Sequence, residues 1–142
     1  HGQVSTYLSP KGGNPVLALR AAGKRTWGTY PFTEAAFIGG AGSVRSLRQQ
    51  RYAGDAMLLG SAELRVEIGR VTFPVPTDFG GLVFGDAGRV FHEDSAGPSS
   101  AWHTGSGGGL WFAPVNRSNV LYLALAAGAG STRFLASIGF AY

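Results

Sequence analysis

The chain has 142 residues, a net charge of +4 and no cysteine, so it is long enough for one domain and holds neither a disulfide nor a thiolate metal site. Charged residues make up 14% of it, below the roughly 25% that is usual for soluble domains. No apolar run reaches the roughly 20 residues that a membrane helix needs, and the mean hydropathy is +0.07. This composition favours a membrane barrel, in which apolar and polar residues alternate and average out.

Strand patterns dominate the chain, and helix signals are almost absent. Glycine, aromatic and β-branched residues recur, and apolar residues alternate with polar ones. The predicted strands are Val4–Leu8, Val16–Lys24, Met57–Ile68, Phe79–Phe91, Trp102–Phe112, Asn119–Ala127 and Thr132–Tyr142. Glycine- and proline-containing turns separate the later strands, so the second half reads as an antiparallel meander. The sequence therefore predicts an all-β fold.

Met57–Ile68 is the clearest amphipathic strand. Its apolar residues point one way, whereas Glu63, Arg65 and Glu67 point the other. Its length matches the roughly 9–11 residues of a tilted membrane strand, while strands of soluble sandwiches are nearer 5–6 residues. We therefore expect these three charged residues to line the interior of a barrel.

The segment Gly39–Gly54 is a glycine-rich turn followed by a basic stretch, and it is the candidate functional loop. Glu63 and Asp86 lie on the polar faces of the two strands that follow it. A guanidinium group can bind carboxylates bidentately, so we expect Arg45 to pair with Glu63 and Asp86 and to hold the loop inside a barrel. The alternative is that all three are separate, solvated charges.

Other chemistry is not indicated by the sequence. The three histidines, His1, His92 and His103, fit no zinc spacing. The run Gly39–Gly42 lacks the ending of a phosphate-binding loop, and no serine lies in a G-x-S-x-G motif. The cations are scattered and not interleaved with aromatic residues, which argues against nucleic-acid binding. We expect no catalytic residue, cofactor, metal or nucleic-acid partner.

At Gly42-Ser43-Val44-Arg45 the chain resembles the BamA/TamA-type bacterial surface-antigen superfamily of outer-membrane barrels. The family's hallmark is a Val-Arg-Gly-aromatic motif in a long loop folded back into the lumen, and here the loop motif is Val44, Arg45, Ser46 and Leu47. Three further features are similar to that family. They are the strand Gly60-Ser61-Ala62-Glu63-Leu64-Arg65, the motif Phe84-Gly85-Asp86-Ala87-Gly88, and a C-terminal signal strand with Phe134, Ile138, Phe140 and Tyr142.

The resemblance implies a 16-stranded antiparallel transmembrane β-barrel in the bacterial cell outer membrane. Residues 1–142 would be the C-terminal portion of the barrel domain, with about six or seven strands, and the upstream strands and periplasmic domains would be absent from this fragment. The implied partners are the rest of the barrel (from the same protein or another chain), lipid and lipopolysaccharide, and outer-membrane or secreted client proteins. Counting turns back from Tyr142 places Gly39–Gly54 on the extracellular side.

The function expected from the resemblance is outer-membrane protein assembly and insertion, or protein translocation, without enzymatic activity. One alternative is a barrel that anchors or exports an N-terminal enzyme domain such as a patatin-like lipase. Another is a soluble β-sandwich binding module. In the membrane-barrel interpretation, Arg48 and Arg51 would contact the barrel wall, lipopolysaccharide phosphates or solvent. Trp102 and Tyr142 would lie in aromatic girdles at the membrane surface.

Overall fold

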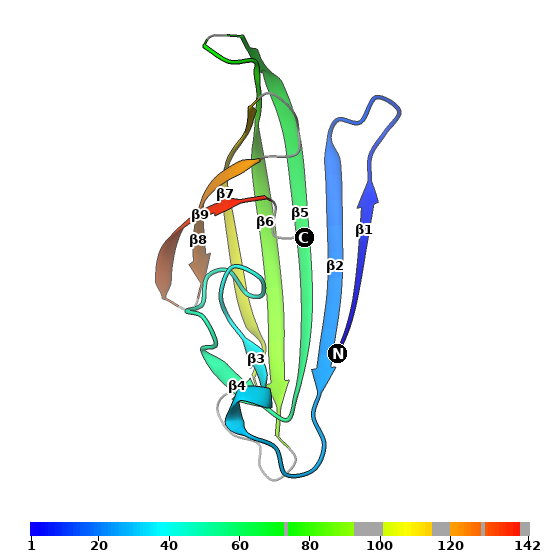
Figure 1. Cartoon of the computed structure of the whole chain (residues 1–142), viewed down its shortest axis with the longest axis vertical. Helices are drawn as coiled ribbons and strands as arrows, with labels where there is room; N and C mark the ends of the chain where they lie inside the picture. The colour runs from blue at the N-terminus through cyan, green and yellow to red at the C-terminus, as the bar shows by residue number, and fades with distance from the viewer. Residues whose placement is uncertain (73, 93–100, 115–119, 129, 140–142) are drawn as a thin grey trace.

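The fold is described from a computed structural model that covers residues 1–72, 74–92, 101–114, 120–128 and 130–139. One antiparallel sheet of seven strands dominates it, in the spatial order β1-β2-β5-β6-β7-β8-β9 (Figure 1). Its strands are β1 (Gly2–Leu8), β2 (Val16–Arg25), β5 (Ala56–Val71), β6 (Thr77–Phe91), β7 (His103–Pro114), β8 (Leu121–Gly128) and β9 (Ser131–Ile138). The prediction of an all-β, antiparallel fold is confirmed.

A second, small sheet lies against one face of the large one. It pairs β3 (Ala36–Ile38) with β4 (Tyr52–Gly54), and a three-residue 3-10 turn, η1 (Phe32–Glu34), precedes it. The segment between β3 and β4 is the glycine-rich loop, which lies in front of β6 and β7 in Figure 1. In the described part of the chain, no helix has the length and hydrophobicity of a membrane-spanning segment.

The large sheet exposes apolar side chains on one of its faces, which we call the outer face. Leu64 on β5 is 37% exposed, Val83 on β6 is 56% exposed and Leu125 on β8 is 56% exposed. Every strand except β2 contributes at least one large, exposed apolar residue to this face, as follows: Val4, Leu8, Leu58, Leu64, Val66, Ile68, Val71, Val83, Phe91, Leu110, Leu121, Leu125, Phe134 and Ile138.

The opposite, inner face buries both apolar and charged residues. One apolar cluster lies there around Phe84, Trp111 and Tyr122, and a second lies between the sheet and the loop, where Ile38 and Val44 pack with Val90. Between these clusters the inner face holds the buried side chains of Glu63, Arg65 and Asp86. The strand alternation predicted for Met57–Ile68 therefore has its polar side inward and its apolar side outward, the reverse of a sheet packed on a water-soluble core.

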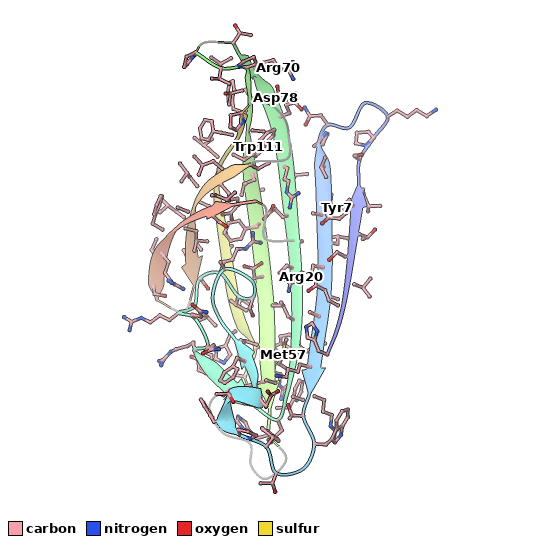
Figure 2. All side chains as sticks on the ribbon, viewed as in Figure 1. Tyr7, Arg20, Met57, Arg70, Asp78 and Trp111 are labelled. Atoms are coloured by element: carbon pink, nitrogen blue, oxygen red, sulfur yellow. The ribbon has the colours of Figure 1, made fainter. Side chains whose placement is uncertain are left out.

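A β-bulge changes the alternation near the end of β5. The register with β6 shifts between Glu67 and Gly69, so Arg70 shares the inner face with Asp78 instead of pointing outward. The Nε and Nη2 groups of Arg70 lie 2.5 and 3.0 Å from the two carboxylate oxygens of Asp78. Figure 2 shows this pair at the end of the sheet far from β3 and β4.

Asn14 supplements the strand pairing beside this bulge. Its side-chain amide donates to the carbonyl oxygen of Glu67 at 2.9 Å, and its Oδ1 accepts from the Glu67 backbone N–H at 2.9 Å. The side chain thus satisfies two backbone groups of β5 just before β2 begins at Val16.

The strand ends differ from the predicted ones at several places. The hairpin of β5 and β6 is longer than expected, because β5 continues to Val71 and β6 already begins at Thr77. Within the described residues, the predicted last strand, 132–142, corresponds to β9, Ser131–Ile138, and Gly139 follows it with a φ of 85°. Phe140 and Tyr142 lie outside the described residues.

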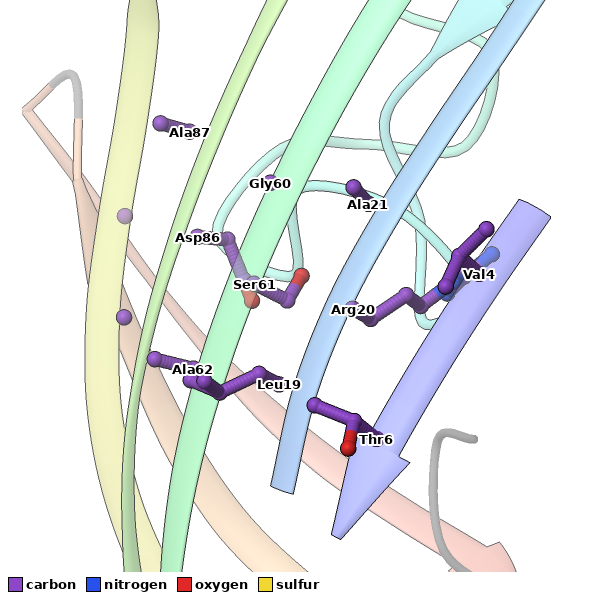
Figure 3. A pocket seen from close by; sticks show the side chains of 12 residues that line it. Val4, Thr6, Leu19, Arg20, Ala21, Gly60, Ser61, Ala62, Asp86 and Ala87 are labelled. Carbon is purple, nitrogen blue, oxygen red and sulfur yellow. The ribbon is translucent and has the colours of Figure 1, made fainter. Parts of the chain in front are cut away.

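A shallow hollow of about 560 Å³ lies on the outer face, across β1, β2, β5 and β6 (Figure 3). Its lining includes the small residues Ala21, Gly60, Ala62 and Ala87, with Leu19 beside them. Cross-strand pairing joins Ala21, Gly60 and Ala87 in one row. The hollow exists because this row carries almost no side-chain volume.

Close backbone packing at Gly80 gives a test of the fold. A Cβ atom there would lie 2.1 Å from the Val66 carbonyl oxygen and 2.7 Å from the Trp111 ring, so Gly80→Ala should lower the free energy of unfolding by about 1–3 kcal/mol. Denaturant unfolding followed by circular dichroism measures this change. Gly60→Ala is the matched control, because its Cβ would meet no atom within 4 Å. Equal stability of the two variants would contradict the inner-face packing described here.

Candidate functional site

The loop between β3 and β4 has a defined backbone conformation. The Gly40 N–H donates to the Leu47 carbonyl oxygen at 3.2 Å, and the Gln50 N–H donates to the Gly39 carbonyl oxygen at 3.4 Å. Gly39 has a φ of 115°, and a Cβ atom there would lie 2.2 Å from the Arg48 carbonyl oxygen. Only glycine fits this position, which lets the two ends of the loop close on each other.

The tip of the loop is a turn formed by Val44, Arg45, Ser46 and Leu47. The Leu47 N–H donates to the Val44 carbonyl oxygen at 3.1 Å, and all four residues are at most 5% exposed. Gln50 is the one described non-glycine residue with a positive φ. Ser46 therefore needs no glycine-like backbone at the position where the resembling motif carries glycine.

The wall of the sheet provides the space that the Ser46 side chain occupies. A Cβ atom at Gly105 would lie 2.2 Å from the Ser46 Oγ, and one at Gly128 would lie 2.7 Å from it. Both glycines come from the inner face of adjacent strands, β7 and β8. The loop tip and the wall are therefore complementary in shape at this point, and larger residues at either glycine would displace the tip.

Arg45 binds both carboxylates that the sequence analysis assigned to it. Its Nε and Nη2 groups lie 2.9 and 2.8 Å from the two oxygens of Asp86, and its backbone N–H donates to the same carboxylate at 3.0 Å. Its Nη1 group forms an ion pair with Glu63. Arg45 and Glu63 are 1% exposed and Asp86 is 4% exposed, so the structure brings all three together out of contact with water.

Three further side chains complete this cluster, which we call the arginine site. The Phe84 ring lies under Arg45, with 3.6 Å from Cζ to the ring centroid, and Tyr122 accepts from Nη1 at 3.3 Å. The Nε of Arg65 lies 2.6 Å from Glu63 Oε1. Two guanidinium groups thus balance two carboxylates, which satisfies the requirement that buried charges be paired. None of the three was assigned to the site from the sequence, although Arg65 was expected on the same face.

The environment of Arg45 favours the protonated, positively charged form of its guanidinium group. Burial lowers the pKa of the guanidinium, but hydrogen bonds and Coulomb attraction from Asp86 and Glu63 outweigh burial and raise the pKa above its ordinary value. Because that ordinary value already lies far above neutral pH, Arg45 stays protonated. The site consequently holds the loop by a permanent charge rather than by one that switches with pH.

Two arginines of the wall also hold the loop, by its backbone. The Nη1 of Arg20, on β2, donates to the Gly42 carbonyl oxygen at 2.8 Å, and the Nη1 of Arg133, on β9, donates to the Leu47 carbonyl oxygen. Ser131 Oγ also lies 3.3 Å from the Ser46 carbonyl oxygen. The sequence analysis missed these contacts, although strand alternation places Arg20 and Arg133 on the inner face. Their carbonyl partners belong to an irregular loop, for which alternation gives no information.

The remaining residues singled out from the sequence lie away from the arginine site. Phe134 and Ile138 are exposed on the outer face of β9, and Trp102 is 52% exposed just before β7. His103 stacks on the Tyr52 ring, with 3.8 Å between the ring centroids. Glu67 lies near the bulge, at the far end of the inner face from the loop.

The arginine site holds the loop against the inner face of the sheet. Among the described residues, no cluster of three or more His, Asp or Glu side chains could hold a metal ion. Comparisons of the chain with protein-family models, with curated proteins and with solved structures found no match.

Arg45→Ala tests whether the arginine site holds the loop. The substitution leaves two carboxylates buried with only Arg65 beside them, so it should lower the free energy of unfolding by about 3–5 kcal/mol. The loop should also become sensitive to proteinase K. Arg48→Ala, an exposed position on the same loop, should change stability by less than about 0.5 kcal/mol. A loop that stays as resistant in Arg45→Ala as in the parent chain would show that the ion pairs do not retain it.

Proposed function

We propose that this chain forms part of a bacterial outer-membrane β-barrel of the BamA/TamA type, which assembles or translocates other proteins. The observation that carries the proposal is the loop folded onto the inner face, with Arg45 bound to Glu63 and Asp86, while the outer face of the same strands is apolar and exposed. The four sequence motifs shared with that family add support. In this proposal the inner face is the wall of the lumen.

The inverted distribution of polarity supports a lipid environment. A water-soluble sheet buries its apolar face and solvates its charges, because apolar surface in water is unfavourable. Here Glu63 is buried while Leu64 and Val66, its neighbours along the strand, are 37% and 40% exposed. Lipid acyl chains would cover such an outer face. The strands β2, β5, β6 and β7 have 10, 16, 15 and 12 residues, enough for the roughly 9–11 that a tilted membrane strand needs.

The two edges of the sheet support the participation of further strands. Within the described residues, β1 pairs with β2 alone and β9 pairs with β8 alone. Unpaired backbone groups are too costly to leave in the hydrocarbon region, so further strands, from the same protein or from another chain, would close the 16-stranded barrel. With the loop on the extracellular side, the Arg70–Asp78 pair would lie at the periplasmic end.

The proposed mechanism involves strand pairing and no covalent chemistry. A client strand would add to an exposed sheet edge through main-chain hydrogen bonds, and the loop would brace the lumen wall meanwhile. The edge strand β9 is short, at 8 residues, and the chain bends directly after it at Gly139. A short edge strand forms few main-chain hydrogen bonds, which suits a seam that must open.

A soluble β-sandwich is less well supported than a barrel. A sandwich buries the inner faces of two sheets against each other, whereas the described strands form one long sheet with a two-stranded sheet over one part of its inner face. The buried charges of the arginine site also differ from the apolar core of a sandwich. The same features also fit a barrel that anchors an enzyme domain. The liposome insertion experiment below distinguishes this anchoring function from the assembly function.

An added charge on the outer face distinguishes lipid from water as its surroundings. Leu125→Arg should destabilise the protein in a bilayer by about 2–4 kcal/mol if the residue lies near the midplane. An arginine in water would cost little at this exposed position. Gln49→Arg, in the exposed part of the loop, adds the same charge as a control. Unfolding titrations in liposomes that give equal stability for both variants would contradict a lipid-facing outer face.

The assembly activity can be measured directly with liposomes that contain the protein. They should accelerate the insertion of an unfolded outer-membrane barrel, followed by its heat-sensitive shift in electrophoretic mobility, relative to liposomes without protein. Arg45→Ala should reduce this rate, because the loop would no longer brace the wall. If the protein inserts stably into liposomes but leaves the client insertion rate unchanged, the assembly function is wrong and the anchoring alternative gains support.

A further inference from the structure

The loop also borders a pocket that lies outside the arginine site. This pocket of about 380 Å³ separates the loop from the turn between β8 and β9, and it is lined by Leu47, Arg48, Arg51, Tyr52 and Ser131. Its volume lies within the roughly 300–1,000 Å³ of small-molecule sites. Residues of the arginine site take no part in its lining.

The backbone presents the two arginines of this pocket in a fixed arrangement. They flank Gln49 and Gln50, and Gln50 adopts a left-handed φ of 52°, which costs free energy at a non-glycine residue. Close contact with Gly39 supports this turn, since a Cβ atom there would lie 2.2 Å from the Arg48 carbonyl oxygen and 3.1 Å from the Arg51 nitrogen. Arg48 and Arg51 are thus held on a braced turn rather than on a free loop.

The pocket carries positive charge that the described residues leave unbalanced. In the ranges that the structure covers, neither Arg48 nor Arg51 forms an ion pair. Glu63 and Asp86, the two carboxylates that the loop contacts in the arginine site, are both bound by Arg45. Arg133 adds a third positive charge beside the pocket, because its guanidinium donates to the carbonyl oxygen of Leu47.

We propose that this pocket binds the phosphate group of an anionic ligand. Each guanidinium presents up to five N–H donors in a planar fork that matches phosphate oxygens, and both arginines line the same pocket. The phosphate could belong to a membrane-lipid headgroup or to a soluble phosphate ester, because both present the same oxygens. The position of the pocket at the loop end of the sheet makes it accessible independently of what the outer face contacts.

Binding should be measured on the full chain in detergent micelles, with two probes. Isothermal titration with inorganic phosphate reports the soluble ligand. Titration with mixed micelles of phosphatidylcholine, with and without phosphatidic acid, reports the headgroup. Arg48→Gln/Arg51→Gln should weaken binding at least about tenfold, because the phosphate loses the charge-assisted hydrogen bonds of two guanidinium groups. Lys11→Gln/Arg25→Gln removes the same charge elsewhere and should leave binding unchanged.

Each outcome decides a part of the proposal. Binding of inorganic phosphate without a preference for phosphatidic acid supports a soluble ester, and a preference for phosphatidic acid supports a lipid headgroup. Absence of binding of both probes to the parent chain, or equal weakening in both double variants, overturns the site. If the Arg48→Gln/Arg51→Gln variant loses its β circular dichroism, Arg48→Gln alone replaces it, since that exposed side chain has no partner among the described residues. Neither probe requires client insertion, so the result is independent of the proposed assembly function.

Discussion

The ion pairs of Arg45 are the interaction on which the inner face depends. Glu63 and Asp86 lie on adjacent strands, near each other in the register, since Asp86 pairs with Ser61 and Glu63 with Phe84. Two carboxylates buried this close would repel each other and lose their hydration. A guanidinium delivered by the loop compensates both. The wall and the loop are therefore parts of one electrostatic unit.

Shape complementarity makes the same coupling specific. Glycines face the loop where it approaches the wall most closely: a Cβ atom at Gly88 would lie 2.9 Å from Val44, and those at Gly105 and Gly128 would meet Ser46. The absence of side chains on the wall allows the loop tip to descend far enough for Arg45 to reach its partners. A high glycine content, 23 of 142 residues, therefore contributes to recognition of the loop as well as to strand flexibility.

Much of the fold could be predicted from the sequence, because strand alternation is a local property. Alternation along Met57–Ile68 placed Glu63 on the polar side, and the same argument applied to Asp86. The predicted strand stopped at Ile68, and alternation alone does not reveal the bulge between Glu67 and Gly69, beyond which Arg70 faces inward. The contacts of Arg20 and Arg133 escaped prediction, since their partners are carbonyl groups of an irregular loop.

These two wall arginines come from strands on opposite flanks of the sheet. Arg20 lies on β2, second from one edge, and Arg133 lies on β9, at the other edge. They donate hydrogen bonds to the backbone carbonyl oxygens of Gly42 and Leu47, which are only five positions apart in the loop. The loop thus connects β2 to β9 across the inner face, and the few residues between its two contact points limit the distance between these strands. The loop therefore links strands that share no hydrogen bonds with each other in the ladder, across the inner face of the sheet.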